Sequence, residues 1–392
     1  MQRVSMDLLA VLRHAVASSA SDVHFKVGQP PVLRIDGVLS PLAEHPPLGD
    51  AQLEDILEQV TVSAPARRRQ FEESGDLDIA FSEPGLPRFR VNGFRQRGAT
   101  SFAFRVIPDV IAGFDELHLP AGVRRLAEEQ RGLVLVTGAT GSGKTTTLAA
   151  MLDHINRTRR QHIVTIEDPI EILHPDKGCI VNQREIGLDT ESFEQALRRV
   201  LRQDPDVILI GELRDAETAK VALQAAESGH LVFSTLHTLD AAETIGRMVE
   251  FFPPEKQAQV RSILAGVLRG VISQRLLVRS RGGRVPAIEV MVTNARIAEL
   301  IREGRVEEIP DAIAEGEFFQ MQTFSASLIE LVLSGEVDRE TAANAATNRH
   351  DFEIALNRAE RAARAAAGEP EREEPPAEKP DDGLPALRVA GG

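Results

Sequence analysis

The sequence has 392 residues, which is too long for one ordinary domain and predicts two folded units and a tail. Apolar residues make up 42% of the chain, enough for real cores, and the formal net charge of −14 argues against the nucleic-acid backbone as the main partner. The single cysteine, Cys179, excludes an internal disulfide and a cysteine-based zinc cluster, which suits the cytoplasm. No stretch approaches about 18 uninterrupted apolar residues, so the sequence predicts no membrane span.

The first hundred residues are typical of a small α+β domain with an antiparallel sheet. Apolar residues at helical spacing predict helices over 5–19, 52–60 and 66–71. Alternating or β-branched runs separated by turn residues predict strands over 21–26, 32–35, 77–81, 88–94 and 100–107.

Basic side chains gather on the last two of these strands. Arg90 and Arg105 lie on the strands themselves, and with Arg95 and Arg97 they form a local basic concentration in an acidic protein. Guanidinium groups placed there either reach the phosphates of a nucleotide held between two domains or form ion pairs on a solvated strand face. The residues alone leave both interpretations open. From Pro108 to Pro120 the periodicity weakens, and a hinge is expected there.

One glycine-rich stretch organises the chain. It follows the apolar run 133–136 and precedes a helical pattern over 146–155, and it matches the phosphate-loop template G-x-x-x-x-G-K-[ST]. In that template, backbone N–H groups and a helix N-terminus surround a polyphosphate, the lysine reaches its terminal phosphates, and the threonine holds Mg²⁺. The predicted nucleotide-binding residues are Gly138, Ala139, Thr140, Gly141, Ser142, Gly143, Lys144, Thr145 and Thr146, with Thr145 as the Mg²⁺ ligand.

Three short apolar runs after this loop, 162–166, 207–210 and 231–234, are separated by helical patterns. They predict a mostly parallel sheet covered on both faces, that is, a RecA-like α/β core. Further strands are expected at an edge over 274–279 and 285–292. Helical patterns then predict a helical subdomain, with helices over 295–302, 306–314, 324–333, 339–346 and 351–367.

Carboxylates follow two of the predicted core strands. Glu167, Asp168 and Glu171 come after the run 162–166, at the sheet edge where an α/β fold binds its ligands. Glu212 follows the run 207–210 in a Walker B arrangement, where a glutamate can polarise the attacking water and contact Mg²⁺ through water. Glu167 and Glu212 are therefore predicted catalytic residues.

Two histidines bracket the run 231–234. His230 precedes it and His237 follows it, and either one could contact a γ-phosphate or pair with a carboxylate. A lone histidine is more often a structural residue, but two of them around one strand favour a functional interpretation. His230 and His237 are both predicted to belong to the catalytic site.

Together these motifs resemble the sequence boxes of the secretion ATPase superfamily, and most closely the type IV pilus retraction ATPases, the PilT/PilU family. The resemblance covers about residues 5–365. The stretches that carry it are Gly138–Thr145, Thr165–Glu171, Asn182–Glu185, Asp204–Asp215 and Gly229–Thr238.

The resemblance implies a cytoplasmic homo-hexamer, peripheral at the inner face of the membrane, that hydrolyses ATP with Mg²⁺ to retract a pilus and so drives twitching motility. Its implied partners are an inner-membrane pilus platform protein and a paralogous retraction ATPase, with membrane contact only through partners and no nucleic acid. It assigns phosphate and Mg²⁺ binding to Lys144 and Thr145 and catalysis to Glu167, Glu212, His230 and His237. Arg90 and Arg105 match paired arginines that the family brings to the nucleotide, which shifts their interpretation toward function.

Some features of the sequence help to decide which branch of this family the chain resembles. Assembly and type II secretion ATPases usually carry an extra N-terminal domain and a four-cysteine motif, so an assembly role is disfavoured. The segment 295–304 resembles the helical segment needed for retraction without fully matching it, and the long helix after Asn348 is more similar to that of the accessory paralogue. The sequence therefore leaves a PilT-like or a PilU-like role open. A nucleic-acid translocase on the same RecA-like core and a non-catalytic ring subunit are less favoured interpretations.

The resemblance and the composition together predict four segments. A PAS-like N-terminal domain is expected over 1–107, a hinge over 108–118, and a RecA-like ATPase domain with its C-terminal helical subdomain over 119–367. The remaining residues, 368–392, are rich in proline and charge and are expected to form a disordered acidic tail.

Overall fold

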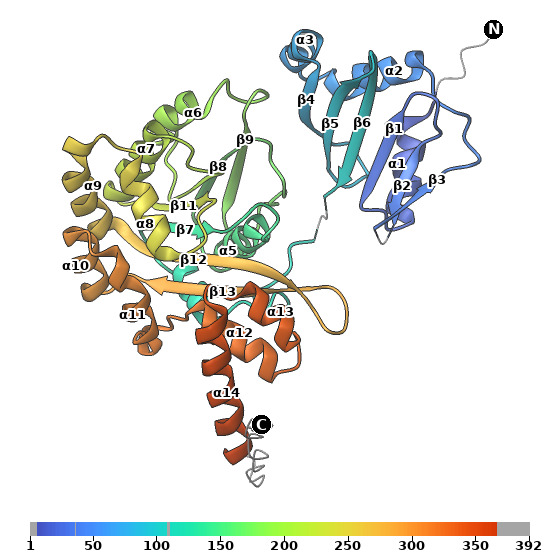
Figure 1. The fold of residues 1–392 in the computed structure, drawn as a ribbon. Coiled ribbons are helices and arrows are strands. Elements are labelled where there is room, and N and C mark those ends of the chain that lie inside the picture. Colours follow the sequence, from blue (N-terminus) through green and yellow to red (C-terminus); the bar gives the residue numbers. More distant parts are fainter. Residues whose placement is uncertain (1–5, 36, 108–109, 367–392) are drawn as a thin grey trace, which may run out of the picture.

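The computed structural model describes residues 6–35, 37–107 and 110–366, and the tail expected over 368–392 lies outside them. Two β-sheets organise the described residues. One sheet is built from strands between residues 22 and 106, and the other from strands between residues 132 and 292 (Figure 1). The RecA-like α/β core preceded by a small α+β unit, which the sequence predicts, is therefore confirmed.

The first sheet has six antiparallel strands in the order β3-β2-β1-β6-β5-β4. Helices α1 (Leu8–Ala17), α2 (Asp50–Thr61) and α3 (Pro65–Ser74) pack on its apolar face. The strands are β1 (Asp22–Lys26), β2 (Val32–Ile35), β3 (Val38–Pro41), β4 (Asp76–Phe81), β5 (Phe89–Gln96) and β6 (Ala99–Val106).

Alternation along these strands separates an apolar face from a polar one. Phe104 lies at the centre of the apolar face, where its ring contacts four others edge to face at centroid distances of 5.2 to 6.3 Å; these are Phe25, Phe81, Phe89 and Phe102. Side chains at the intervening positions point to the other face. Arg90 and Arg105 lie on that polar face, directly opposite each other in β5 and β6.

The second sheet has seven strands in the order β13-β12-β7-β11-β10-β8-β9. All its neighbouring strands run parallel except β13, which pairs antiparallel with β12 at one edge. The strands are β7 (Gly132–Thr137), β8 (His162–Glu167), β9 (Ile180–Glu185), β10 (Val207–Ile210), β11 (Leu231–Leu236), β12 (Leu268–Val278) and β13 (Arg284–Val292).

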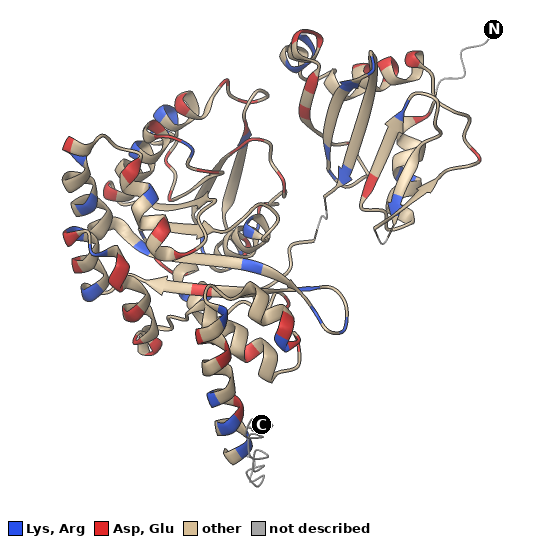
Figure 2. Cartoon of the chain, viewed as in Figure 1, with Lys and Arg blue, Asp and Glu red and all other residues tan. Residues whose placement is uncertain are grey.

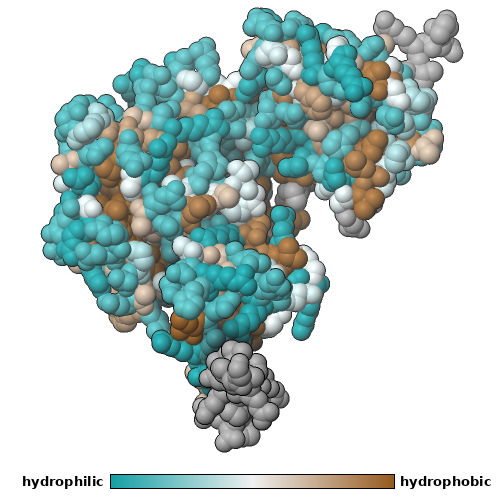
Figure 3. Space-filling model, viewed as in Figure 1, coloured by the Kyte–Doolittle hydropathy of each residue, from teal (hydrophilic) through white to brown (hydrophobic). Residues whose placement is uncertain are grey.

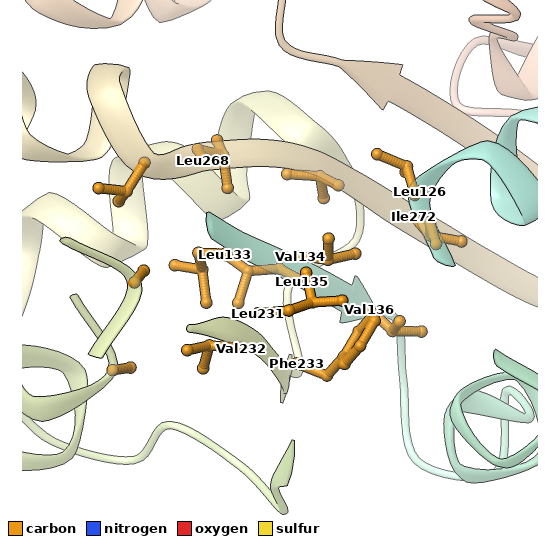
Figure 4. Packing of buried hydrophobic residues seen from close by; sticks show 14 of the residues in the cluster. Leu126, Leu133, Val134, Leu135, Val136, Leu231, Val232, Phe233, Leu268 and Ile272 are labelled. Atoms are coloured by element: carbon orange, nitrogen blue, oxygen red, sulfur yellow. The ribbon is translucent and has the colours of Figure 1, made fainter. Parts of the chain in front are cut away.

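Strand β7 lies at the centre of the larger core. Every residue from Gly132 to Thr137 is buried, because helices cover the sheet on both faces. Figure 4 shows Leu133–Val136 packed between side chains of β11 and β12. The covering helices are α4 (Ala121–Ala127), α5 (Lys144–Thr158), α6 (Phe193–Val200), α7 (Ala216–Glu227), α8 (Ala241–Glu250), α9 (Pro254–Val267), α10 (Ala295–Glu303) and α11 (Ile309–Ala314).

Three further helices form a separate cluster, here called the C-terminal bundle: α12 (Phe324–Leu333), α13 (Arg339–Ala345) and α14 (Arg349–Ala366). Its core includes Phe324, Leu328, Phe352 and Leu356, and it also takes in Leu277 from β12. The bundle is therefore built onto the ends of β12 and β13 that extend beyond the rest of the sheet (Figure 1).

The structure differs from the predicted elements at several strands. Strand β12 begins at Leu268 rather than at 274 and lies inside the sheet, because its first half pairs with β7. The two strands that the sequence did not predict, β3 and β9, are edge strands with exposed or polar side chains, so they lack the periodicity of a half-buried strand. The predicted helix over 306–314 is a 3₁₀ turn (Val306–Glu308) followed by α11.

An aromatic side chain packs the segment before α4 against the core. Phe114 is buried, its ring centroid lies 5.2 Å from that of His154 on α5, and the guanidinium carbon of Arg124 lies 4.9 Å from the same ring centroid. The second half of the predicted hinge 108–118 is thus anchored. The limits of the predicted domains, at 107 and 118, remain predictions that limited proteolysis would test.

Charged residues of both signs are spread over helices and strands of both parts (Figure 2). The face shown in Figure 3 is mainly hydrophilic, with hydrophobic surface over the edge of the first sheet that carries β2 and β3. There Val38 and Leu39 are 65% and 52% exposed. Among the described residues, no helix combines the length and the apolar character needed to span a membrane.

Candidate nucleotide-binding site

A glycine loop joins β7 to α5. Strand β7 ends at Thr137 and α5 begins at Lys144, so the predicted strand, loop and helix are all present. Gly138 has φ of +138°, and a Cβ there would lie 2.4 Å from the carbonyl oxygen of Gln274, so only glycine fits. The first-turn N–H groups of α5 have no intrahelical acceptors and, with the positive end of the helix dipole, favour a bound phosphate.

Lys144 and Thr145 occupy the first turn of α5. The Lys144 ammonium donates to the carbonyl oxygens of Gly138 at 2.7 Å and Ala139 at 3.1 Å. Burial lowers the pKa of Lys144, and the nearby charge of Glu171 acts against this shift. Thr145 is half-buried. Of the other predicted loop residues, Ala139, Thr140, Gly141 and Thr146 are exposed, Gly143 is half-buried and Ser142 is buried.

Glu167 is the last residue of β8 and is buried. Its Oε1 accepts hydrogen bonds from Thr165 Oγ1 at 2.6 Å and from Gln183 Nε2 at 3.2 Å. Burial nevertheless raises the pKa of Glu167 to about 7. This carboxyl group therefore exchanges its proton near neutral pH, which is the range useful for proton transfer.

Glu212 and His237 lie together after neighbouring strands. Glu212 follows β10 by one intervening glycine, His237 directly follows β11, and Glu212 Oε2 lies 3.1 Å from His237 Nε2. The other Glu212 oxygen forms an ion pair with Arg214. Burial lowers the pKa of His237, and the charges of Lys144 and Arg214 act in the same direction, which favours the neutral imidazole. The contact is then a hydrogen bond to a carboxylate.

Hydroxyl groups fix the ends of these two strands against each other. Ser234 Oγ donates to the carbonyl oxygen of Ile210, and Thr235 Oγ1 donates to that of Gly211, both at 2.7 Å. Strands β7, β11, β10 and β8 are adjacent and parallel, so the loop, His237, Glu212 and Glu167 all lie at the carboxyl edge of the sheet.

His230 lies at the opposite edge. It precedes the first residue of β11, and its carbonyl oxygen accepts from the N–H of Gly132, the first residue of β7. Its ring Nδ1 lies 2.9 Å from the carbonyl oxygen of Ala225 and 3.0 Å from Ser228 Oγ. The six residues of β11 therefore separate the two histidines within a single chain, and the prediction that both belong to the catalytic site stays a prediction.

The two predicted arginines contact different parts of the molecule. Arg90 is half-buried and reaches across to the larger part of the molecule, where its Nη1 lies 3.1 Å from Glu171 Oε1; it also pairs with Asp78 at 2.8 Å. Arg105 is 71% exposed and pairs with Asp22 of its own sheet at 3.0 Å. Arg90 is thus brought to the loop that follows Glu167, and Arg105 is not.

Two arginines that the sequence did not single out also join the first sheet's unit to the region that runs from the end of β8 to the end of β9. Arg88 forms a buried ion pair with Glu185 on β9. Arg67 on α3 donates to the Ile186 carbonyl oxygen at 2.8 Å and pairs with Asp168 at 3.3 Å. Arg88 lies two residues before Arg90 and directly before β5, so its alternation with Arg90 was visible in the sequence but its partner was not. Nothing distinguishes Arg67 from its neighbours in α3.

The oxygen donors at this edge suit Mg²⁺. Thr145 supplies a hydroxyl group and Glu212 a carboxylate, and Mg²⁺ prefers one or two such protein oxygens together with substrate phosphates and waters. The residues therefore fit a metal that arrives with a nucleotide.

A hollow of approximately 870 Å³ opens beside the Glu212–His237 pair. Its lining also includes Arg214 and, on helix α8, Glu243 and Glu250. Water can therefore reach the Glu212 carboxylate, which a residue that activates water requires.

A central parallel strand that runs into a phosphate loop, with a glutamate after the strand two places away, defines the P-loop nucleoside triphosphatases. The model of the family "Type II/IV secretion system protein" matches residues 2–281. The type IV pilus retraction ATPase PilT of Pseudomonas aeruginosa is 46% identical over 88% of this chain and 100% of its own length. The PilU ATPase of the same organism is 39% identical over 90% of this chain and 91% of its own.

Among solved structures, the crystal structure of the pilus retraction motor PilT with bound ADP superposes with a TM-score of 0.82 at 44% identity, covering 89% of this chain and 100% of that one. The chain belongs to the type II/IV secretion system protein family and, within it, to the type IV pilus retraction ATPases.

Proposed function

We propose that this chain is an ATP-hydrolysing motor subunit that retracts a type IV pilus and so powers twitching motility. The observation that carries the proposal is the single sheet edge that combines the phosphate loop, Glu167, Glu212 and His237. The chain is 46% identical to a pilus retraction ATPase over that protein's whole length, which supports the pilus as the structure that the motor moves.

ATP would bind with its phosphates against the N-terminus of α5. The loop N–H groups and the Lys144 ammonium hold the β- and γ-phosphates, and Lys144 exchanges its bonds to Gly138 and Ala139 for bonds to phosphate oxygens. Thr145 and, through water, Glu212 would hold Mg²⁺, which neutralises charge on the β- and γ-phosphates when it is bound.

Hydrolysis would proceed by attack of water in line with the bond to the leaving ADP. Glu212 accepts hydrogen bonds from the attacking water and orients it, and His237 holds the Glu212 carboxylate through the 3.1 Å hydrogen bond. The products are ADP and inorganic phosphate, and the water proton leaves with the phosphate or through Glu212. Glu167, whose pKa of about 7 suits it to proton exchange, would take up and release protons at the same edge of the sheet.

Mechanical work would come from movement of the first sheet's unit against the core. Arg90 is the arginine placed to respond to the nucleotide, because it already contacts the loop after β8. Arg105, on the same polar face, would serve a neighbouring subunit of a homo-hexameric ring. His230 takes no part in catalysis within its own chain.

The proposed setting is the cytoplasmic face of the inner membrane. The ring acts there on a pilus platform protein and contacts the membrane only through such partners, beside a paralogous retraction ATPase. Between the two retraction roles, we favour the PilT role, since identity is 46% to PilT and 39% to PilU.

Deletion of the gene in its source organism tests the proposal. We expect more surface pili and loss of twitching, with recovery by the wild-type gene and none by a Lys144→Ala variant. Bald cells would instead indicate an assembly motor and overturn the proposal. Expression in hosts that lack either PilT or PilU separates the two roles, and rescue of the PilU-deficient host alone would refute the PilT role.

A further inference from the structure

Strand β12 extends beyond the strand that carries the phosphate loop. It pairs with β7 from Leu268 to Ser273, and Ser273 lies opposite Thr137, the last residue of β7. The remaining residues, 274–278, pair only with β13. Figure 1 shows β12 and β13 continuing past the other strands, with α12 and α13 beside them. We call residues 274–278 the β12 extension.

The β12 extension lies against the flank of the phosphate loop. The carbonyl oxygen of Gln274 would be 2.4 Å from a Cβ on Gly138, and the side chain of Leu276 would be 3.6 Å from a Cβ on Gly143. The first and the last glycine of the loop therefore both face this one strand.

Side-chain hydrogen bonds hold the loop at both of its ends. Thr137 Oγ1 donates to Ser273 Oγ at 3.0 Å where the loop begins. Gln274 is 1% exposed, and its Nε2 donates to the carbonyl oxygen of Ser142 at 2.6 Å where the loop ends. Ser142 stands two residues before Lys144, so the Gln274 bond fixes the peptide groups that lead into α5.

Neighbouring residues of the same extension reach the C-terminal bundle. The Arg275 guanidinium donates to the carbonyl oxygen of Ala345 and, at 3.2 Å, to Thr347 Oγ1, and its carbon lies 4.2 Å from the Phe324 ring centroid. Leu277 is buried in the core of the bundle. Because successive side chains of a strand point to opposite faces, Gln274 contacts the loop while Arg275 and Leu277 contact the bundle.

We propose that Gln274 is a positioning residue for the phosphate loop, and that the β12 extension makes the position of this loop depend on the C-terminal bundle. Phosphate affinity depends on loop N–H groups held within a few tenths of an ångström of their working positions, at about 2.9 Å from their acceptors. A shift of the bundle, such as a partner would cause, moves Arg275 and Leu277 and with them Gln274. The inference rests on the proposed nucleotide site and adds a route for its regulation.

The first test removes the amide donor. Gln274→Met keeps the length and volume of the side chain and loses the bond to Ser142. In the full-length protein, we expect the dissociation constant of a fluorescent ADP analogue to rise roughly fivefold, the effect of one neutral hydrogen bond. The KM for ATP should rise with it while kcat stays within about twofold, because Gln274 touches no reacting atom.

Matched controls separate positioning from a general loss of stability. Gln257→Met on α9 removes a half-buried bond of the same chemical kind, from Nε2 to the carbonyl oxygen of Phe252, and should leave ADP affinity unchanged. Gln274→Glu replaces the donor by a charge that repels phosphate, and we expect a larger loss than for Gln274→Met. Wild-type ADP affinity in both Gln274 variants, or an equal loss in Gln257→Met, would overturn the positioning role.

The second test addresses the bundle. Arg275→Lys keeps the charge but loses the planar fork that reaches Ala345 and Thr347. We expect a roughly two- to threefold loss of ADP affinity, although this residue contacts no atom of the loop. Arg339→Lys alters a contact inside the bundle, between α13 and α14, and is the control. If Arg275→Lys binds ADP as the wild type does, the dependence on the bundle is refuted.

The wild-type protein in the same assays distinguishes this inference from the proposed function. A wild-type chain that binds no ADP would contradict the proposed nucleotide site itself. A chain that binds ADP, shows the expected losses in the variants and does not retract pili would leave the inference standing and refute only the pilus role.

Discussion

At the scale of single residues, environment assigns different tasks to chemically identical groups. Glu167 is buried among Thr165 and Gln183 and holds its proton up to about pH 7. Glu212 faces the hollow beside His237, and one of its carboxylate oxygens pairs with Arg214. The first group can exchange a proton with its surroundings, and the second can orient a water molecule.

Replacement of Glu212 by glutamine tests its proposed role. We expect Glu212→Gln to lower kcat for ATP hydrolysis by roughly a hundredfold or more, because the amide cannot accept a proton from water. ADP affinity should stay within about twofold, since the phosphates are held by the loop. Steady-state turnover and titration with a fluorescent ADP analogue measure the two quantities. Glu250→Gln, an exposed change in the same hollow, is the control, and unimpaired turnover in Glu212→Gln would refute the assignment.

The raised pKa of Glu167 makes stability depend on pH. Its folded-state pKa of about 7 lies above the ordinary value of 4.5, so in this window the folded chain binds a proton that the unfolded chain has lost. Stability is then lost as pH rises from 4.5 through 7, by up to about 3 kcal/mol. Urea denaturation of the wild type and of Glu167→Gln at about pH 5 and about pH 8 measures this. We expect the wild type to lose more stability than the variant between these pH values; parallel losses would contradict the shift.

At the scale of elements, the sequence predicted those strands whose side chains follow a burial pattern. The continuous apolar run of β7 and the alternation of β5 and β6 are examples, and both are explained by the layers that cover them. The sequence did not predict strand β9, although Asn182–Glu185 was recognised as a motif. Its residues are polar because their partners are side chains of other elements, such as Glu167 for Gln183, and a single sequence does not reveal such partners.

The same reasoning explains which site residues were found. Lys144 and Glu212 follow from local spacing, because a strand, a turn and a helix are specified by neighbours in sequence. His230 and His237 flank the same strand, and the parallel pairing of β11 with β7 shows that His237, and not His230, lies at the edge that carries the loop. Arg88 and Gln274 act through contacts 97 and 132 residues away along the chain, which spacing does not encode.

The buried pair between Arg88 and Glu185 stabilises edge strand β9 from outside its own sheet. Arg88→Met would leave the Glu185 carboxyl buried without its cation, at a cost of about 3 kcal/mol. We expect amide hydrogen exchange in β9 to accelerate roughly a hundredfold. Arg68→Met, which removes exposed ion pairs on α3, is the control and should leave β9 unchanged. Equal exchange rates in β9 for Arg88→Met and wild type would contradict this role.

At the scale of the whole molecule, the segment after β8 connects the nucleotide site to the first sheet's unit. Glu171 lies 3.1 Å from Arg90 Nη1, and its charge also acts on Lys144. Lys144 comes from the phosphate loop and Arg90 from the other sheet, so one carboxylate stands close to two cations that we propose to serve phosphate. An incoming triphosphate would compete with Glu171 for both of them, and the relative position of the two units would then depend on the nucleotide.

This competition predicts the effect of neutralising Glu171. We expect Glu171→Gln to raise ATP affinity roughly two- to fivefold, a small gain because Arg90 and Glu171 are each 38% exposed and screened by solvent. The gain should shrink at high salt, because screening weakens the attraction that Glu171 exerts. Glu54→Gln, which removes an exposed carboxylate paired with Arg68, is the control and should leave affinity unchanged. If Glu171→Gln instead binds ATP more weakly, Glu171 helps to build the site, and the two units respond to nucleotide through other contacts.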